Sequence, residues 1–250
     1  MDYEFIRRAE RVTSFNLVAA DFKELTHKKE IQMLFGKYFF PNFDLSQTLD
    51  TVDQDRINQL VDQLRRQDKE MLSRLISYPL KGIGPGEIMM YFLVNRATIG
   101  GGSSAGVDLF VDDSKYEVKA ASVSKDRFAT NFKLGAAVPV AALMKELYEM
   151  LHNMRTNRPE LTSELEGTRT GISGGTVNRM RELGGSAFSD LEDAYAELAY
   201  THYFSHHPTI IINNKAVNRV GLIEDIKYIQ KSDIQIERLT AGTLKPRIRL

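Results

Sequence analysis

The stretch "GVDLFVDDSKYEVKAASV", residues 106–123, decides the fold that the sequence predicts. Two runs of strand-forming residues flank the polar "DDSK" at 112–115, a composition typical of a β-hairpin and its turn. Side chains at positions i and i+2 of a strand point to the same face of a sheet. Glu117 and Lys119 should therefore stand side by side on the second strand, while Val118 points to the opposite face.

Segments on both sides of this hairpin predict a single α/β domain with a mixed central sheet flanked by helices. We expect a helical region over residues 1–80 that packs on a core over residues 81–250, as one continuous domain. Asp50 or Thr51 is the predicted cap of a long helix that ends before Pro79. The predicted helices cover residues 51–78, 87–97, 136–154 and 187–206, the predicted strands cover 107–111, 116–123, 209–213 and a hairpin within 234–250, and the glycine-rich segments 98–106 and 168–176 are predicted loops.

The composition excludes several classes of protein. The 250 residues, of which 42% are hydrophobic, suffice for a proper core. Basic and acidic residues both number 33, so the net charge is zero and bulk charge does not favour nucleic-acid coating, although a local basic site stays compatible. The absence of cysteine excludes disulfides, thiolate catalysis and cysteine-based zinc sites. Without a signal-peptide pattern or a membrane-length apolar run, we expect a cytoplasmic protein with no membrane partner.

The hairpin also brings together a candidate chemical site. If its strands pair around the turn, Asp108 lies across from Glu117 at about 4.5–5.5 Å, where two carboxylates repel each other unless a cation lies between them. Oxygen ligands, with no cysteine and no clustered histidine nearby, favour Mg²⁺ or Mn²⁺ over Zn²⁺. Lys119 on the same face could hold an attacking water or neutralise charge on a phosphate. Glu87, near the start of a predicted helix, is a plausible fourth member.

These residues carry a resemblance to a known superfamily. "GE" at 86–87, "GVD" at 106–108 and "EVK" at 117–119 resemble the motifs of the PD-(D/E)XK nucleases, which have a restriction-endonuclease-like fold. The resemblance implies that Asp108 and Glu117 are metal ligands, that Lys119 is the catalytic lysine, and that Glu87 completes the metal site. It also implies that the carbonyl of Val118 can reach the metal.

The function implied by this resemblance is Mg²⁺-dependent hydrolysis of DNA phosphodiester bonds that leaves 5′-phosphate ends. Val107 stands where the superfamily has proline, which is a departure from its motif. The helix pattern of the superfamily's exonuclease branch is missing, so we expect an endonuclease. A homodimer would bring two sites to the two strands of a duplex. Two other functions stay open: a non-catalytic nucleic-acid-binding or assembly protein with the same fold, and a metal-dependent enzyme for another phosphate ester. For the pair Glu117 and Lys119 alone, a solvated salt bridge is the simpler interpretation.

A basic segment follows the hairpin and is the predicted DNA-binding region. Between residues 115 and 133, five lysines or arginines face two acidic residues, a local charge of +3. An ordinary solvated loop is an equal alternative. The C-terminal "KPRIRL", residues 245–250, could line a DNA cleft or form a charged edge strand, and the sequence does not separate these two roles. The candidate DNA contacts are Ser122, Lys125, Arg127, Asn131 and Lys133.

Overall fold

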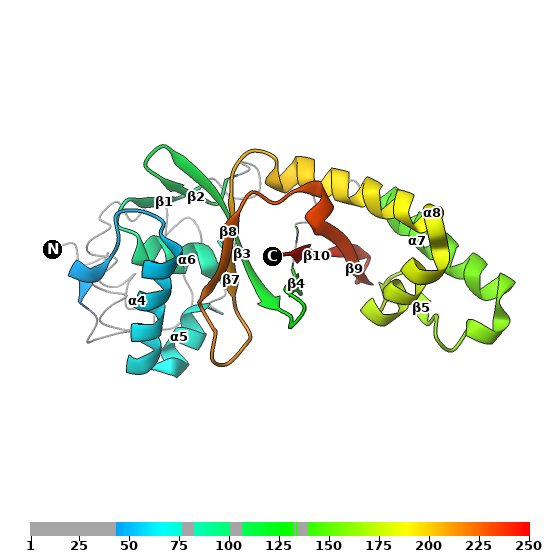
Figure 1. Cartoon of the computed structure of the whole chain (residues 1–250), viewed down its shortest axis with the longest axis horizontal. Coiled ribbons are helices and arrows are strands. Elements are labelled where there is room, and N and C mark those ends of the chain that lie inside the picture. Colours follow the sequence, from blue (N-terminus) through cyan, green and yellow to red (C-terminus); the bar gives the residue numbers. More distant parts are fainter. Residues whose placement is uncertain (1–43, 77–82, 101–106, 133, 135–139) are drawn as a thin grey trace, which may run out of the picture. The chain divides into compact units, whose positions relative to one another are not determined.

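A computed structural model describes residues 44–76, 83–100, 107–132, 134 and 140–250, which form two compact units (Figure 1). The first unit comprises Met1–Ala121 and His207–Lys227, and the second comprises Ser122–His206 and Tyr228–Leu250. Both units combine helices with a sheet, which confirms the predicted α/β class. The boundary predicted near residue 80 lies inside the first unit, and the first 43 residues lie outside the described part of the chain.

The helices of the first unit begin and end at other residues than predicted. The side chain of Asp53, not that of Asp50 or Thr51, accepts a hydrogen bond from the backbone of Arg56 and caps the first long helix. The predicted single helix is also divided at Asp68, which has extended backbone angles and caps the next helix instead. The helical segments are η1 (Leu45–Gln47), α4 (Gln54–Gln67), α5 (Lys69–Ile76) and α6 (Pro85–Leu93).

The segment predicted as a helix over residues 87–97 contains both a helix and the start of a strand. Helix α6 begins earlier, at Pro85, because the fixed φ of proline suits the first helical position. It ends at Leu93, and Ala97–Ile99 forms strand β1, which the sequence analysis assigned partly to a helix and partly to a loop. A strand of three residues is too short to show a recognisable alternation of apolar and polar side chains.

The sheet of the first unit has the strand order β1–β2–β3–β7–β8. Strands β3 and β7 run parallel, and the other described neighbours run antiparallel, so the sheet is mixed. Val118, Ile210 and Ile212 lie buried in one core with residues of α4, α5 and α6, which cover that face (Figure 1). The strands are β1 (Ala97–Ile99), β2 (Leu109–Val111), β3 (Ser114–Val123), β7 (Thr209–Asn213) and β8 (Ile223–Lys227).

The hairpin predicted at residues 107–123 is present as β2 and β3, joined by a turn at Asp112 and the residue that follows it. Strand β7 has the predicted bounds. Strand β8 was not predicted, because its "IEDIK" holds three charged residues and resembles a polar loop; its first two residues are buried and the other three are partly exposed. Residues 122–123 of β3 already belong to the second unit, where they pair with β4.

The second unit contains an antiparallel sheet in the order β3–β4–β10–β9–β6–β5. The C-terminal hairpin was predicted and is confirmed, whereas β4 lies in a segment predicted to be a loop. The 168–176 loop is instead a short hairpin that leads into a helix. The strands are β4 (Phe128–Thr130), β5 (Gly167–Thr168), β6 (Gly171–Ile172), β9 (Ile234–Thr240) and β10 (Thr243–Arg249).

The second unit also holds the two longest described helices, α7 (Ala141–Asn157) and α8 (Gly174–Ala199). Helix α8 begins at Gly174, well before the predicted start at residue 187, and is interrupted only at Gly185, which has a φ of 54°. A π-helical segment, η3 (Tyr200–Phe204), extends α8, and 3₁₀ turns occur at η2 (Pro159–Leu161) and η4 (Lys231–Asp233). Within the described ranges, no helix combines the length and apolar character needed to cross a membrane.

Helix α8 also contacts the edge of β9 through a pair of charged side chains. The Glu192 carboxylate accepts a hydrogen bond from the backbone N–H of Ile236 at 2.8 Å. The Arg181 guanidinium donates to the carbonyl of the same residue at 2.8 Å and also pairs with Glu192. Both backbone groups of Ile236 on this side are therefore satisfied by side chains.

Candidate active site

The candidate site lies in the first unit where strands β2 and β3 separate. Their last paired residues are Leu109 and Tyr116, and one step further the Asp108 N–H still donates to the Tyr116 carbonyl at 3.1 Å. The next donor of β3, the N–H of Val118, binds the Asp108 carboxylate at 2.9 Å instead of a strand carbonyl. Because the N–H and C=O of one strand residue point to the same side, the Val118 carbonyl points towards Asp108 as well.

Lys119 lies between two carboxylates. Its ammonium donates to Asp108 Oδ2 at 3.1 Å and forms a close ion pair with Glu117 Oε1. The prediction that Glu117 and Lys119 share one face of β3 agrees with this contact. Both side chains are largely buried, so the solvated salt bridge that seemed the simplest interpretation is wrong.

Glu87 joins these residues from the first turn of α6. Its Oε1 accepts a hydrogen bond from the Gly84 N–H at 3.0 Å, which caps the helix. The helix start approaches the sheet closely because Gly86 has no side chain: a Cβ there would lie 3.1 Å from both Val118 and Ile212. Glycine at position 86 thus lets the carboxylate at position 87 reach the cluster.

His207 is a fifth member that the sequence analysis missed. Its Nε2 lies 3.7 Å from Glu117 Oε2, and its side chain is only 6% exposed. The next residue, Pro208, accepts the Glu117 N–H at 3.0 Å, because β7 runs parallel to β3 with Thr209 opposite Glu117. A histidine just before a strand with three consecutive isoleucines was the available signal, but using it required knowledge of the parallel pairing of β3 with β7.

The electrostatics of this cluster follow from burial and crowding of like charges. Burial, followed by the charge of Asp108, raises the pKa of Glu87 from 4.5 to about 8. Burial also raises the pKa of Glu117 to about 7, with Asp108 adding to this effect and Lys119 opposing it. Burial alone would lower the pKa of Lys119, but Asp108 and Glu117 outweigh it and raise that pKa above 10.5. Lys119 therefore stays an ammonium.

The donor set fits a hard divalent cation. Glu87, Asp108 and Glu117 carry three negative charges when ionised, and the Lys119 ammonium offsets only one of them. Carboxylates and a backbone carbonyl are the ligands that Mg²⁺ and Mn²⁺ prefer. As the described residues stand, no three Asp, Glu or His side chains form a ready metal-binding group. The Lys119 ammonium occupies the position between Asp108 and Glu117 that a cation would need.

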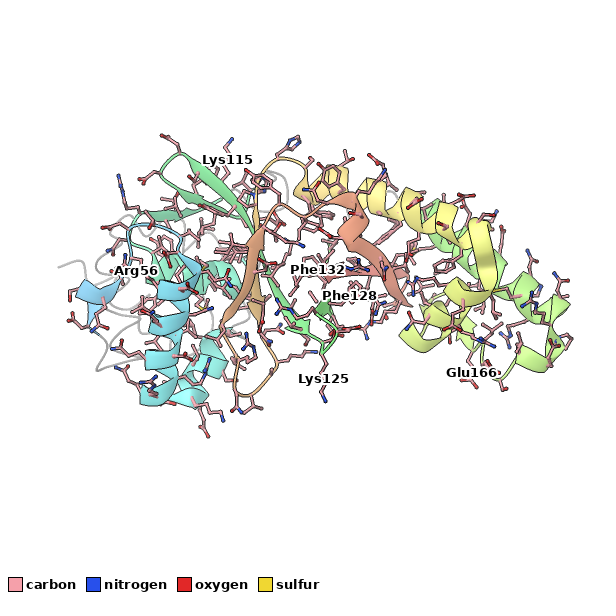
Figure 2. The ribbon with its side chains drawn as sticks, viewed as in Figure 1. Arg56, Lys115, Lys125, Phe128, Phe132 and Glu166 are labelled. Carbon is pink, nitrogen blue, oxygen red and sulfur yellow. The ribbon has the colours of Figure 1, made fainter. Side chains whose placement is uncertain are left out.

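The candidate DNA contacts lie in the second unit and differ in exposure. Lys125 and Arg127 are exposed (Figure 2 labels Lys125). The Ser122 hydroxyl is buried and has no hydrogen-bond partner among the described residues, so it is not presented at the surface. The side-chain oxygen of Asn131 accepts a hydrogen bond from Arg238. Lys133, the last of these candidates, lies outside the described residues.

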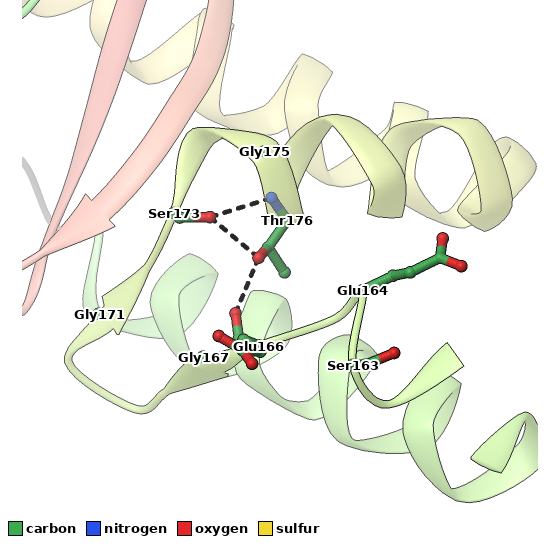
Figure 3. Close-up of a pocket in the computed structure, with 8 residues that line it drawn as sticks. All are labelled: Ser163, Glu164, Glu166, Gly167, Gly171, Ser173, Gly175 and Thr176. Carbon is green, nitrogen blue, oxygen red and sulfur yellow. Dashed lines mark hydrogen bonds between the residues drawn. The ribbon is translucent and has the colours of Figure 1, made fainter. Parts of the chain in front are cut away.

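A separate hollow of about 470 Å³ lies at the start of α8 in the second unit (Figure 3). Ser173 accepts the Thr176 N–H at 3.1 Å, and the Thr176 hydroxyl donates to the Glu166 carbonyl at 2.8 Å. These polar groups satisfy one another, so the hollow presents a helix cap rather than a set of groups aimed at a ligand.

Comparison with known proteins finds no relative of this chain. No family model, no curated protein and no solved structure matches the chain.

Proposed function

We propose that this chain is a Mg²⁺-dependent endodeoxyribonuclease of the PD-(D/E)XK type, with Mn²⁺ as an alternative metal and DNA as the substrate. The observation that carries the proposal is the convergence of three carboxylates and one lysine from the first turn of α6, the residue just before β2 and the middle of β3. A hairpin that opens at an aspartate, beside a helix with a glutamate in its first turn, supports the restriction-endonuclease-like fold.

Each residue has a distinct role in this proposal. Asp108 and Glu117 hold the cation, Glu87 completes its shell, and the Val118 carbonyl supplies a further oxygen. A bound Mg²⁺ supplies Lewis-acid polarisation of the scissile phosphate and lowers the pKa of a water molecule. The Lys119 ammonium must leave at least one carboxylate when the cation binds, which frees it to orient that water or to neutralise charge on the phosphate.

His207 has a positioning role in the same site. Glu117 Oε1 contacts Lys119, whereas Oε2 faces His207 at 3.7 Å. The imidazole and the Pro208 carbonyl together fix the orientation of Glu117 at the point where β3 begins to pair with β7. Because the His207 side chain is buried, the Glu117 oxygen that faces it, Oε2, is kept away from bulk water.

The test is plasmid cleavage by the purified full chain with Mg²⁺ or Mn²⁺, compared with Asp108→Asn and Lys119→Met. Each variant should lose at least about 100-fold in cleavage rate, because each removes a group that acts on the scissile phosphate or its metal. The matched controls are Asp113→Asn and Lys115→Met, two exposed positions of the same hairpin (Figure 2 labels Lys115), and both should cleave like the parent. Absence of cleavage by the parent on double- and single-stranded DNA would contradict the proposal.

One observation favours a second candidate, a non-catalytic nucleic-acid-binding or assembly protein. A lysine bridging two buried carboxylates is also the geometry of a purely structural ion cluster. In that case Asp108→Asn and Lys119→Met should lower stability while DNA binding persists and no cleavage occurs. Calorimetric titration with Mg²⁺ separates the two, since the structural cluster predicts no saturable binding that Asp108→Asn removes.

A further inference from the structure

The C-terminal strand β10 is an interior strand of the second unit's sheet. It pairs with β9 along most of its length, and with β4 at Ile248 and Arg249 on the other side. Arg249 is therefore not on a charged edge strand protected against aggregation, which was one of the two roles left open by the sequence. The alternation of the strand separates two faces: Leu244 and Ile248 are buried, and Lys245, Arg247 and Arg249 point the other way.

Neighbouring strands extend this charged face. Arg238 of β9 lies opposite Lys245, and Phe128 of β4 lies opposite Arg249. Residues directly opposite each other in a sheet point to the same side. The five residues that we call the basic sheet face are Phe128, Arg238, Lys245, Arg247 and Arg249.

Two arginines of the face are held in place by Phe128. The Arg247 guanidinium lies 4.1 Å from the centre of the Phe128 ring, and that of Arg249 lies 5.2 Å from it. Arg247 also donates two hydrogen bonds to the side chain of Gln235, at 3.2 and 3.1 Å. An arginine that is already ordered loses less conformational entropy when it binds a phosphate.

The carboxylates beside Arg247 contact it only at long range. Asp126 and Glu237 each lie 3.8 Å from the Arg247 guanidinium. Arg249 is exposed, and the Nε of Arg238 is buried without a hydrogen-bond partner among the described residues. Phe128 is covered by the arginines, so the face offers charge rather than apolar area. Such a surface suits a polyanion.

We propose that the basic sheet face binds the phosphate backbone of DNA. Arg247 and Arg249 are two residues apart on an extended strand, about 7 Å, which allows their guanidinium groups to reach successive phosphates. Contacts of this kind position a duplex without reading its sequence. The choice of DNA as the polyanion rests on the proposed function. The positive charge of the face and the fixed positions of its arginines are independent of that proposal.

The experiment measures binding of a fluorescently labelled DNA duplex to the full chain in EDTA, over a series of salt concentrations, so that cleavage plays no part. Arg249→Ala should weaken binding several-fold and reduce the slope of log K against log salt by about 1. Lys245→Ala combined with Arg249→Ala should reduce it by about 2, and Arg249→Lys should retain binding because the charge stays. The matched control is Arg179→Ala, an arginine on α8 paired with Glu164 and Glu182.

Circular dichroism confirms that each variant is folded before its affinity is compared. The proposal is overturned if the parent does not bind DNA, if the double variant binds like Arg179→Ala, or if the face captures anionic lipid vesicles and not DNA. Failure of the face and failure of the nuclease proposal are distinguishable. If the face variants bind DNA more weakly than the parent but the parent cleaves no plasmid, the proposal for the basic sheet face holds and the nuclease proposal fails. If the parent cleaves plasmid but the face variants bind DNA as well as the parent, only the proposal for the face fails.

Discussion

The two hairpins of this protein use charge in opposite ways. In β2–β3, acidic and basic side chains of opposite sign are buried against each other, and the pKa of Glu117 is raised to about 7. In β9–β10, basic side chains stand on a partly exposed face, where Arg247 and Arg249 stack on Phe128 and Arg247 makes only long contacts with the carboxylates of Asp126 and Glu237. Burying the charges of the first hairpin costs desolvation free energy, and the shifted pKa values that result suit catalysis. The charges of the second hairpin stay partly hydrated at little cost, and they suit the binding of a polyanion.

This difference predicts where substitutions matter. Breaking a buried ion pair leaves an uncompensated charge in a poorly solvated place, whereas removing one exposed arginine leaves a surface that water can cover. Substitutions in the first hairpin should therefore change stability strongly and with a marked pH dependence. Substitutions in the second should change stability little and affinity more.

The largest expected effect is that of Lys119→Met at pH 8. The variant leaves Glu87, Asp108 and Glu117 without their ammonium, and we expect a loss of about 3–5 kcal/mol in the free energy of unfolding. The matched Lys115→Met, on the exposed start of the same strand, should stay within about 0.5 kcal/mol of the parent. Urea unfolding measures both, and equal stabilities of the two variants would refute the buried cluster.

The second effect is a pH dependence of stability in EDTA. Between pH 4.5 and about 8, Glu87 is ionised in the unfolded chain but protonated in the folded one. The unfolded state then binds fewer protons, so stability should fall as pH rises through this range, by up to about 1.4 kcal/mol per pH unit for one group. Glu117 adds to the fall up to about pH 7.

The matched variants for this prediction are Glu87→Gln and Glu70→Gln. The first should flatten the dependence of the melting temperature on pH, and the second, at an exposed position of α5, should leave it unchanged. Added Mg²⁺ should raise the melting temperature more at pH 8 than at pH 5, because protons compete with the cation. A parent whose melting temperature does not change with pH would contradict the raised pKa values of the crowded carboxylates.

A smaller effect is expected for Arg247→Ala in the second hairpin. The variant loses the stacking on Phe128 and two hydrogen bonds to Gln235, and stability should decrease by about 1 kcal/mol. Arg249→Ala, with the longer ring contact and an exposed side chain, should cost less. Thermal unfolding ranks the two, and a cost for Arg247→Ala as large as that of Lys119→Met would erase the contrast between the hairpins.

The smallest effect concerns the turn of the second hairpin. Ala241 and Gly242 both have positive φ, at 51° and 69°, which is the requirement of a type I′ turn. Alanine is strained there, and asparagine tolerates this conformation better. Ala241→Asn should therefore stabilise the protein by about 0.5 kcal/mol. A higher melting temperature checks this, and Thr240→Asn, outside the two turn residues, serves as the comparison.

The sequence predicted those elements whose pattern is local. The hairpin with Glu117 and Lys119, the isoleucine-rich β7 and the alternating C-terminal hairpin all carry a period of two or a continuous apolar run. Strands β1 and β4 are three residues long and were missed, because so few residues hold no period. The cap at Asp53 was misplaced by two or three residues, since several neighbouring residues are equally good caps.

The site was predictable to the extent that it lies on one hairpin and one helix start. Asp108, Glu117 and Lys119 are brought together by a turn of two residues, so their proximity follows from local pairing. His207 reaches the cluster only through the parallel pairing of β7 with β3, about ninety residues apart in the chain. Burial, which shifts the pKa values, likewise depends on helices packed from elsewhere and was not readable from the hairpin alone.

The side-chain pair at Ile236 has a consequence for the behaviour of the protein at high concentration. An open strand edge is a template on which a second chain can add a strand of its own. Glu192 and Arg181 present an acceptor and a donor to that residue just as a neighbouring strand would, while β6 covers the part of β9 around Leu239. Because Glu192, Arg181 and β6 together occupy this edge of β9, a strand of another molecule cannot pair with it. The second unit should therefore resist self-association by strand addition at this edge.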